Sequence, residues 1–204
     1  RRAWYQYPGQ GSAFYLNGYS QPSQVARVLE NGSTQMTQTT YNVKGRVTSR
    51  TDPLGRQTTH TYAANGIDLL EVRQVSGGST DLLATYANYN ALHLPGTTTD
   101  GAGQSTTIIY NAAGQPLTIT NAKSEVTTYV YDADGDLQTV SGPVANSTTT
   151  YTQDGYGRVS SVTEPDGYTL SMLYDGLNRL TRRTSPDGTY DETTYARLDV
   201  ATER

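Results

Sequence analysis

The chain has 204 residues, a net charge of −4, no cysteine, 34% hydrophobic residues, and 17 tyrosines against one Phe and one Trp. A charged fraction of only 17%, with abundant Thr, Ser, Asn, Gln and Gly, indicates a folded, turn-rich chain rather than a charge-swollen disordered one. Mild acidity argues against nucleic acid as a partner, the lack of a long apolar run argues against a membrane segment, and the lack of cysteine excludes disulfides, thiol catalysis and cysteine-ligated zinc.

Residues 1–18 at the start of the chain are irregular. They crowd five aromatic side chains into a short stretch, namely Trp4, Tyr5, Tyr7, Phe14 and Tyr15. We expect a cap or a degenerate first repeat here, followed by one continuous repeat array over residues 19–204. Because the sequence begins with Arg rather than Met, we also expect the chain to be a segment of a longer protein.

A tyrosine recurs about every 21 residues through the array. These positions, which we call the tyrosine slots, are Tyr19, Tyr41, Tyr62, Tyr89, Tyr110, Tyr131, Tyr174 and Tyr195, with Gln153 in the slot before Tyr174. The interval from Tyr62 to Tyr89 is 27 residues long, and we expect it to hold a longer loop near residues 76–79. Regular self-similarity of this kind is typical of repeat architectures.

Each slot is followed by a turn signature. Asn or Asp comes directly after most slots, and glycine stands four residues after five of them, at Gly45, Gly66, Gly114, Gly135 and Gly157. In the other units this position holds Ser23, His93, Asn178 and Asp199. Because Gly, Asn, Asp and His tolerate a positive φ best, the pattern predicts a left-handed turn residue there.

A second turn signature lies eleven residues after the slot. Its clearest forms are residues 52–55, 100–103, 164–167 and 185–188, and weaker forms are 30–33 and 121–124. A capping side chain at the first place, Pro at the second and Gly at the fourth favour a type I turn. The segments between turns, such as 46–51, 115–120, 158–163 and 169–174, are rich in Thr, Val, Ile, Leu and Tyr and have strand length.

These features together predict an all-β fold. Each repeat is a β-hairpin of about 21 residues, and tight turns make successive strands antiparallel. The tandem hairpins then join into one long sheet that curls or spirals, because a sheet of many strands twists. A β-propeller with two repeats per blade is the alternative architecture.

The joint pattern resembles the RHS/YD-repeat family. The motifs that carry the resemblance are Tyr41-Asn42-x-x-Gly45 before Asp52-Pro53-Leu54-Gly55, and Tyr174-Asp175-Gly176-Leu177-Asn178-Arg179 before Ser185-Pro186-Asp187-Gly188. The match covers residues 41–200 well and residues 19–40 loosely. The resemblance implies a secreted protein whose repeats form part of a spiralling β-sheet, which closes into a hollow shell in bacterial toxin complexes, polymorphic toxins and the teneurins.

In the toxins of that family, the shell holds a C-terminal effector that a self-cleaving core domain releases. The sequence contains neither the Asp-Pro-x-Gly-Leu signature of that core nor a distinct domain after the repeats. The resemblance therefore carries over the shell structure, and neither self-cleavage nor toxin chemistry.

The residues themselves predict no catalytic, cofactor or metal site. The two histidines, His60 and His93, fall in a strand segment and at the left-handed turn position, and no G-x-S-x-G elbow or phosphate-binding loop is present. Residues 132–136 resemble the start of a calcium loop, but their glycine is fourth instead of sixth and Pro143 stands where a bidentate Glu belongs. We expect them to form an ordinary repeat turn.

The sequence therefore predicts a non-catalytic structural module, part of the β-sheet shell of a secreted RHS/YD-repeat protein. Its expected partners are a toxin or effector segment that it encloses or presents, and other parts of the same shell. The alternative is a cell-surface adhesin or carbohydrate-binding module, in which exposed tyrosines stack on glycans or pack on a partner protein. The expected location is outside a bacterial cell or on its surface, without nucleic acid or cofactors.

Overall fold

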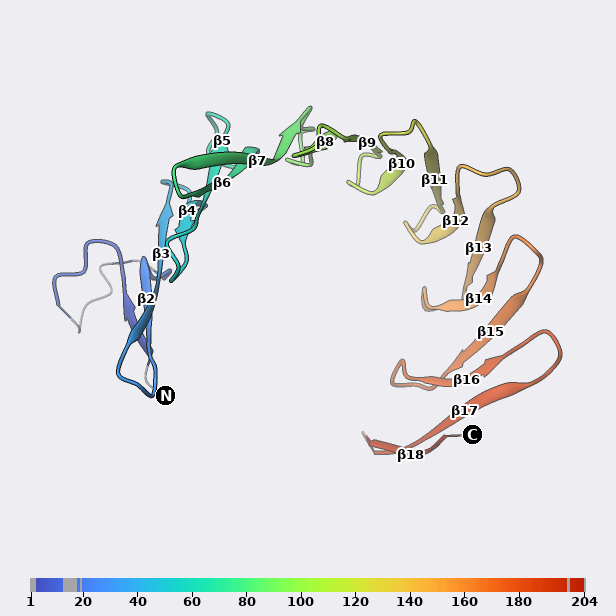
Figure 1. The fold of residues 1–204 in the computed structure, drawn as a ribbon. Helices are drawn as coiled ribbons and strands as arrows, with labels where there is room; N and C mark the ends of the chain where they lie inside the picture. The colour runs from blue at the N-terminus through green and yellow to red at the C-terminus, as the bar shows by residue number, and fades with distance from the viewer. Residues whose placement is uncertain (1–2, 13–17, 19, 198, 204) are drawn as a thin grey trace. The chain divides into compact units, whose positions relative to one another are not determined.

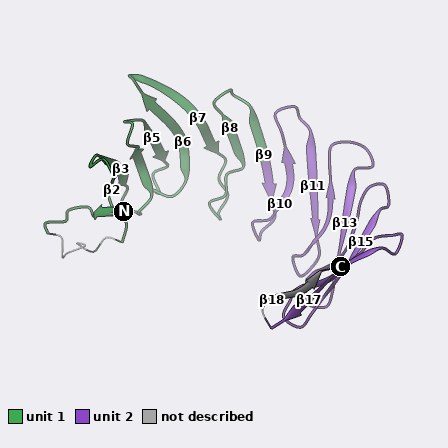
Figure 2. Ribbon diagram, turned by 60° about the horizontal axis from the view of Figure 1, so that its bottom comes forward, with its two compact units in different colours: residues 1–107 green, residues 108–204 purple. Residues whose placement is uncertain are grey.

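The computed structural model describes residues 3–12, 18, 20–197 and 199–203. Within these ranges the chain is all-β, with 18 strands and no helix (Figure 1). The chain divides into two compact units, residues 1–107 and residues 108–204 (Figure 2). No helix in the described part of the chain is long and apolar enough to cross a membrane.

The predicted strand segments are confirmed. The strands of unit 1 are β1 Ala3–Gln6, β2 Gln24–Val28, β3 Thr34–Tyr41, β4 Val47–Thr51, β5 Gln57–Tyr62, β6 Leu69–Ser76, β7 Ser79–Ala87 and β8 Thr97–Asp100. The unit boundary falls inside β9, Ser105–Tyr110. The strands of unit 2 are β10 Pro116–Thr120, β11 Val126–Tyr131, β12 Leu137–Ser141, β13 Thr148–Gln153, β14 Val159–Thr163, β15 Thr169–Tyr174, β16 Leu180–Thr184, β17 Tyr190–Ala196 and β18 Asp199–Glu203.

Strands pair antiparallel with their neighbours along the chain. In unit 1 the pairing runs from β1 to β9, and in unit 2 it runs from β10 to β18. This is the predicted array of hairpins, because a short connection reverses the chain beside the strand just completed. The propeller alternative is wrong, since a propeller would interrupt the pairing after every fourth strand.

A β-bulge recurs at the tyrosine slots, which lie at or near the C-terminal ends of their strands. The register shifts at Thr40/Tyr41, Thr61/Tyr62, Val130/Tyr131, Thr152/Gln153, Leu173/Tyr174 and Thr194/Tyr195. A bulge places one extra residue opposite its partner strand, increases the local twist and re-aims side chains. The slot side chain is therefore positioned by an irregularity that the 21-residue period did not reveal.

The described part of the sheet has no hydrophobic core. No hydrophobic side chain among the described residues is buried. In unit 2 the cross-strand pairs Tyr129–Val140 and Tyr151–Val162 are half-buried on one face. The other face carries the hydroxyl-bearing pairs Thr118–Thr128, Thr128–Ser141, Ser141–Thr148 and Thr139–Thr150. Cross-strand contacts and hydrogen bonds stabilise the repeats in place of a core.

The long interval between Tyr62 and Tyr89 holds longer strands, and the predicted longer loop near residues 76–79 is wrong. β6 and β7 are joined by the two-residue turn Gly77-Gly78, with φ of 58° and 86°. Two consecutive positive φ angles give a hairpin turn whose twist matches that of the strands, and adjacent glycines adopt them without steric cost. Ser76 and Ser79 pair directly across this turn.

Two of the four substitutes at the left-handed position also depart from expectation. Asp199 is the first residue of β18, and the positive φ of that turn belongs to Arg197, at 59°. Ser23 precedes β2 and is not among the residues with positive φ. Tyr19, Phe14 and Tyr15 lie outside the described residues. The division at residue 18 between a cap and the array stays a prediction, although β1 pairs with β2.

Candidate functional site: the links between repeats

The turn after most tyrosine slots is built by the Asn or Asp that follows the slot. In the turn after Tyr174, Oδ1 of Asp175 accepts hydrogen bonds from the backbone N–H groups of Leu177 at 2.8 Å and Arg179 at 3.0 Å. Equivalent pairs of bonds are made by Asn42, Asn90, Asn111, Asp132 and Asp154. One side chain thus satisfies two turn amides, which explains why Asn and Asp predominate at this place.

The left-handed residue predicted at the fourth place of this turn is confirmed. Positive φ is found at Gly45, Gly66, Gly114, Gly135 and Gly157, with values between 71° and 90°, and also at His93, 61°, and Asn178, 62°. Residues 132–136 follow the same plan, because Asp132 Oδ1 is occupied by two backbone amides. No group of three or more His, Cys, Asp or Glu residues among those described is arranged to hold a metal ion.

At six of the tyrosine slots the side chain links its repeat to the one before it. The hydroxyl of Tyr62 donates to the carbonyl oxygen of Val47 at 3.0 Å, and Tyr174 and Tyr195 make the same bond to Val159 at 2.8 Å and Leu180 at 2.9 Å. Tyr41 and Tyr89 bond to Pro22 and Leu69 in the less regular repeats. The carbonyls of Val47, Val159 and Leu180 each lie two residues beyond the last cross-strand pair that their strand makes with the strand of the tyrosine, so the hydroxyl bonds a group that this ladder no longer pairs.

A second set of links runs between consecutive turns through the residue five places after the slot. The guanidinium of Arg158 bonds Oδ2 of Asp154 in its own turn, through Nε at 2.7 Å and Nη2 at 2.6 Å. Its Nη1 donates to the carbonyl oxygen of Asp175 and to Oδ1 of Asn178, both at 3.0 Å, in the next turn. One cation thereby bridges two repeats.

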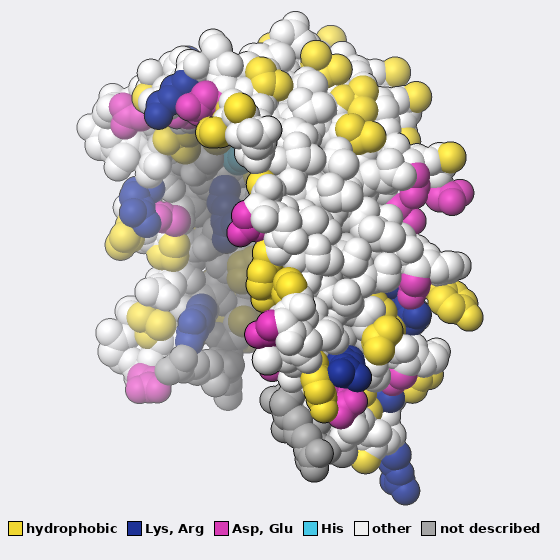
Figure 3. Space-filling model, turned by 90° about the vertical axis from the view of Figure 1, so that its right-hand side faces the viewer, with side chains coloured by type: hydrophobic (Ala, Val, Ile, Leu, Met, Phe, Trp, Pro, Cys, Tyr) yellow, Lys and Arg dark blue, Asp and Glu magenta, His cyan; other side chains and the backbone are white. Residues whose placement is uncertain are grey.

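Tyrosine rings complete the Arg158 link. Its guanidinium carbon lies 5.0 Å from the ring centroid of Tyr156 and 4.7 Å from that of Tyr174. Arg179 repeats the arrangement one unit later, with bonds to Asp175 and a distance of 4.1 Å to the Tyr195 ring. Stacking on an aromatic face and bonding a carboxylate are both suited to the planar guanidinium. Figure 3 shows such positive and negative side chains lying next to one another on a largely uncharged surface.

Other residues make comparable links elsewhere in the array. Gln115, also five places after a slot, donates through Nε2 to the carbonyl oxygen of Gly135 at 2.8 Å. Asn42 Nδ2 donates to the carbonyl oxygen of Gly66 at 2.9 Å. The link therefore tolerates different donors, provided that the donor reaches a carbonyl of the following turn. The sequence interpretation missed these links, although the four-residue spacing of Asp154/Arg158 and Asp175/Arg179 repeats visibly.

The two histidines have different environments. Nδ1 of His93 lies 2.7 Å from Oδ1 of Asp68, whose other oxygen accepts a bond of 2.7 Å from Asn65. Asp68 is 9% exposed, and this contact is another link between successive turns. His60 lies in β5, and its Nδ1 is shielded from solvent without a hydrogen-bond partner among the described residues. Burial lowers the pKa of His60.

Charges in the links shift several pKa values. The hydrogen bond from Arg158 lowers the pKa of Asp154, and that from Arg179 lowers the pKa of Asp175, each helped by backbone amides. Burial raises the pKa of Tyr131. Each carboxylate is thus stabilised in its charged form by the groups that form the link, which marks it as a structural ion pair rather than an acid or base held ready for proton transfer.

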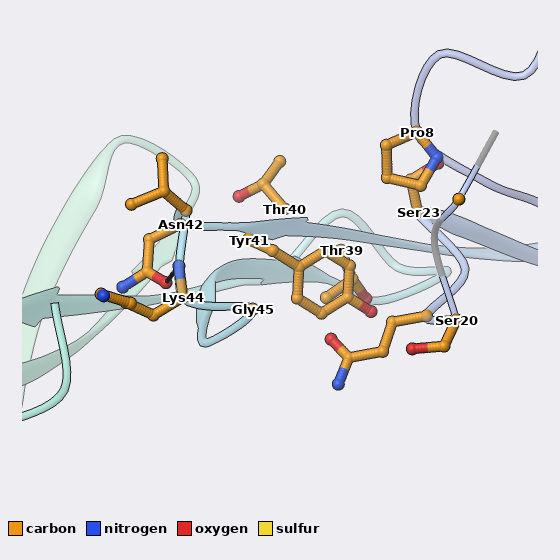
Figure 4. A pocket seen from close by; sticks show the side chains of 12 residues that line it. Pro8, Ser20, Ser23, Thr39, Thr40, Tyr41, Asn42, Lys44 and Gly45 are labelled. Carbon is orange, nitrogen blue, oxygen red and sulfur yellow. Dashed lines mark hydrogen bonds between the residues drawn. The ribbon is translucent and has the colours of Figure 1, made fainter.

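One pocket of unit 1 is large enough to hold a small ligand. It has a volume of about 830 Å³, and Tyr41 is among the residues that line it (Figure 4). Asn42 and Lys44 lie on one side of the Tyr41 ring, and Pro8 and Ser20 lie on the other. The Tyr41 hydroxyl donates to the carbonyl oxygen of Pro22 at 2.9 Å, which holds the ring in place.

Comparison with known families agrees with the repeat frame. The profile of the RHS Repeat family matches residues 41–66, 110–148, 131–169 and 154–190, which together span more than half of the chain. These ranges begin at or next to tyrosine slots. No curated protein matches the sequence.

Solved structures of Tc toxin components are similar in fold. The crystal structure of TcdB2-TccC3 matches with a TM-score of 0.69 and 16% identity, over 85% of this chain and 11% of that chain. The same pair without the hypervariable C-terminal region gives 0.70 and 15%, over 86% and 11%. The Tc holotoxin pore of Photorhabdus luminescens, with a mutation in TccC3, gives 0.68 and 16%, over 85% and 11%. The chain thus spans only a small part of those chains, and the likeness concerns the fold.

Proposed function

Since the chain belongs to the RHS-repeat family, we propose that it is a structural, non-catalytic module of a β-sheet shell that encloses or presents a toxin, effector or partner segment. The observation that carries this proposal is the double set of links between repeats. Tyr174 joins its strand to Val159 one repeat back, while Arg158 joins its turn to Asp175 one repeat on. Such links hold successive repeats together, as a continuous shell wall requires.

The chemistry of the links suits a wall that must hold without a core. Most of the links end on a backbone carbonyl, which every residue type supplies, so the residue at that end of the link is not restricted in type. An antiparallel sheet with its neighbours in place has no free edge between repeats and resists insertion of another strand or of a protease. Secretion from a bacterium and a cargo within the same longer protein are parts of this proposal.

Limited proteolysis of the full-length natural protein that contains this chain tests the proposal. We expect the segment that the shell encloses to survive trypsin while the wall is intact, and to be cleaved when Gly135→Val and Gly157→Val disrupt two turns together. Gly155→Ala, at a glycine of the same turn without positive φ, is the matched control. A segment cleaved at the same rate in all three proteins would contradict enclosure.

A carbohydrate-binding role is the second candidate, and the pocket that Tyr41 lines favours it. An aromatic ring flanked by amide, hydroxyl and amino groups is suited to stacking on a sugar and bonding its hydroxyls. Binding of soluble oligosaccharides to the chain, lost in Tyr41→Ala and retained in Tyr62→Ala, would support this role. Absence of binding across a broad glycan panel would remove it and leave the shell proposal untouched.

A further inference from the structure

The sequence holds three Asn-Gly pairs, and the two that lie wholly within the described residues are in turns of unit 1. Asn31-Gly32 connects β2 and β3, and Asn65-Gly66 connects β5 and β6. Asn followed by Gly is prone to an intramolecular reaction, because glycine has no Cβ to hinder approach of its backbone nitrogen to the side-chain carbonyl carbon of the Asn. Both Asn side chains are exposed, so access to water does not distinguish the two pairs.

The surroundings of Asn31 favour the reaction. Its Oδ1 accepts hydrogen bonds from the backbone N–H of Ser33 at 3.0 Å and from the Ser33 hydroxyl at 2.7 Å. When the Gly32 nitrogen attacks Cγ, negative charge develops on this oxygen, and the two donors already point at it. Apart from Gly32 and its two chain neighbours, no residue places an atom within 4 Å of the position that a Gly32 Cβ would take, so the turn has room to move.

The surroundings of Asn65 oppose the reaction. Its Nδ2, the group that must leave, donates to Oδ2 of Asp68 at 2.7 Å. Its Oδ1 also accepts two hydrogen bonds, from the backbone amides of Ile67 and Asp68, so the difference from Asn31 lies in the held leaving group and in Gly66. Gly66 is held as well, since its carbonyl oxygen accepts a bond from Asn42 and the side chain of Lys44 packs 3.1 Å from its Cβ position.

We propose that Asn31-Gly32 is a site of spontaneous deamidation, promoted by Ser33, and that Asn65-Gly66 is protected by the link between turns. The Gly32 nitrogen loses its proton to solvent base and bonds to Asn31 Cγ. The bond from Cγ to Nδ2 breaks, and Nδ2 takes up a proton and leaves as ammonia. Water then opens the five-membered imide at either carbonyl and yields aspartate or isoaspartate at position 31.

The product changes the β2–β3 turn. Either outcome adds a negative charge, and isoaspartate also lengthens the backbone by one methylene group. The turn is closed by bonds from Gly32 N to Leu29 O at 3.0 Å and from Leu29 N to Ser33 O at 2.8 Å, which a longer backbone would displace. A modified chain is therefore expected to lose strand pairing first at Val28–Thr34, the pair next to this turn.

Peptide mapping by mass spectrometry of the folded chain, incubated in mildly alkaline buffer, tests the proposal. We expect the Asn31 peptide to deamidate at least about tenfold faster than the Asn65 peptide, because the latter must first open its turn, at a free-energy cost of the order of 1.4 kcal/mol or more. In denaturing urea the two rates should converge. Equal rates in the folded chain, or a faster rate at Asn65, would overturn the proposal.

Two variants test the part assigned to Ser33. Ser33→Ala removes the hydroxyl donor and is expected to slow the reaction at Asn31 by about two- to tenfold, less than in an enclosed oxyanion hole because water can replace the donor. Ser33→Thr retains a hydroxyl and is expected to restore most of the rate. Asn65 in the same molecules reports any general change in stability. Unchanged rates in Ser33→Ala would remove Ser33 from the mechanism.

Discussion

The side-chain amide of Gln153 donates a hydrogen bond of 2.6 Å to the carbonyl oxygen of Leu137. Tyr174 bonds Val159 from the next slot in the same way, through a hydroxyl instead of an amide. Glutamine therefore replaces tyrosine in the array without loss of the link, because both side chains are long enough to bring a donor to a carbonyl of the preceding strand. The slot requires a side-chain donor that reaches this carbonyl, and a tyrosine hydroxyl is the group that most often supplies it.

Replacement of Gln153 measures the link directly. Gln153→Ala leaves the Leu137 carbonyl without its partner and should lower the free energy of unfolding by about 0.5–1.5 kcal/mol, whereas Gln153→Tyr should be close to neutral. Gln138→Ala, at an exposed position of the neighbouring strand, controls for loss of a glutamine side chain. Denaturant melts of the three variants would contradict the link if Gln153→Ala were no more harmful than Gln138→Ala.

The left-handed turn residues give a second prediction. Gly135 has φ of 90°, and Gly135→Ala should cost about 1–2 kcal/mol because a Cβ is disfavoured there. Gly155 lies in a similar turn without positive φ, and Gly155→Ala should be neutral or stabilising by up to about 1 kcal/mol. Asn178→Gly should also be near neutral, since Asn178 already has φ of 62°. Equal losses at Gly135 and Gly155 in urea melts would refute the turn geometry.

Arg158 and Arg183 form ion pairs of unequal importance. Arg158 and Asp154 are 20% and 24% exposed, and Arg158 also bonds the next turn, whereas Arg183 and Asp191 are 52% and 70% exposed. Arg158→Gln should therefore lower the melting temperature clearly, and Arg183→Gln should leave it almost unchanged. Added salt should weaken the Arg183 pair more than the Arg158 link. A larger loss from Arg183→Gln in calorimetry would contradict this ranking.

The features that follow from local chemistry could be predicted from the sequence. The turn at residues 52–55 and the positive φ of Gly135 depend on the backbone preferences of single residues, so each can be recognised from the residues at that place. The link from Arg158 to Asp175 could not be inferred in this way, because it depends on how far one turn is rotated from the next. The prediction of a longer loop near Gly77-Gly78 failed for a similar reason. The two strands extend up to this turn because they pair with each other, and such pairing is not visible in the residues of one segment.

The carboxylates of the links predict a loss of stability in acid. Hydrogen bonds from Arg158 and Arg179 hold the pKa values of Asp154 and Asp175 below their ordinary value of 3.8. A group whose pKa is lower in the folded state contributes stability that is complete above the unfolded pKa and is lost as the pH falls through the folded pKa. Stability should thus fall below about pH 4. The double variant Arg158→Gln, Arg179→Gln should show a shallower fall, and an equally steep one would contradict the assignment.

His60 predicts a separate pH dependence at milder acidity. Its pKa is lowered from 6.5 by burial, and Nδ1 has no partner among the described residues. Between its folded pKa and 6.5 the unfolded chain therefore binds more protons than the folded chain, so the free energy of unfolding must decrease as the pH falls through this window. His60→Gln removes the titrating group and should flatten the decrease. Urea melts at closely spaced pH values above the range where the carboxylates titrate measure the difference. Parallel curves for the two proteins would show that His60 is as easily protonated in the folded chain as in the unfolded one.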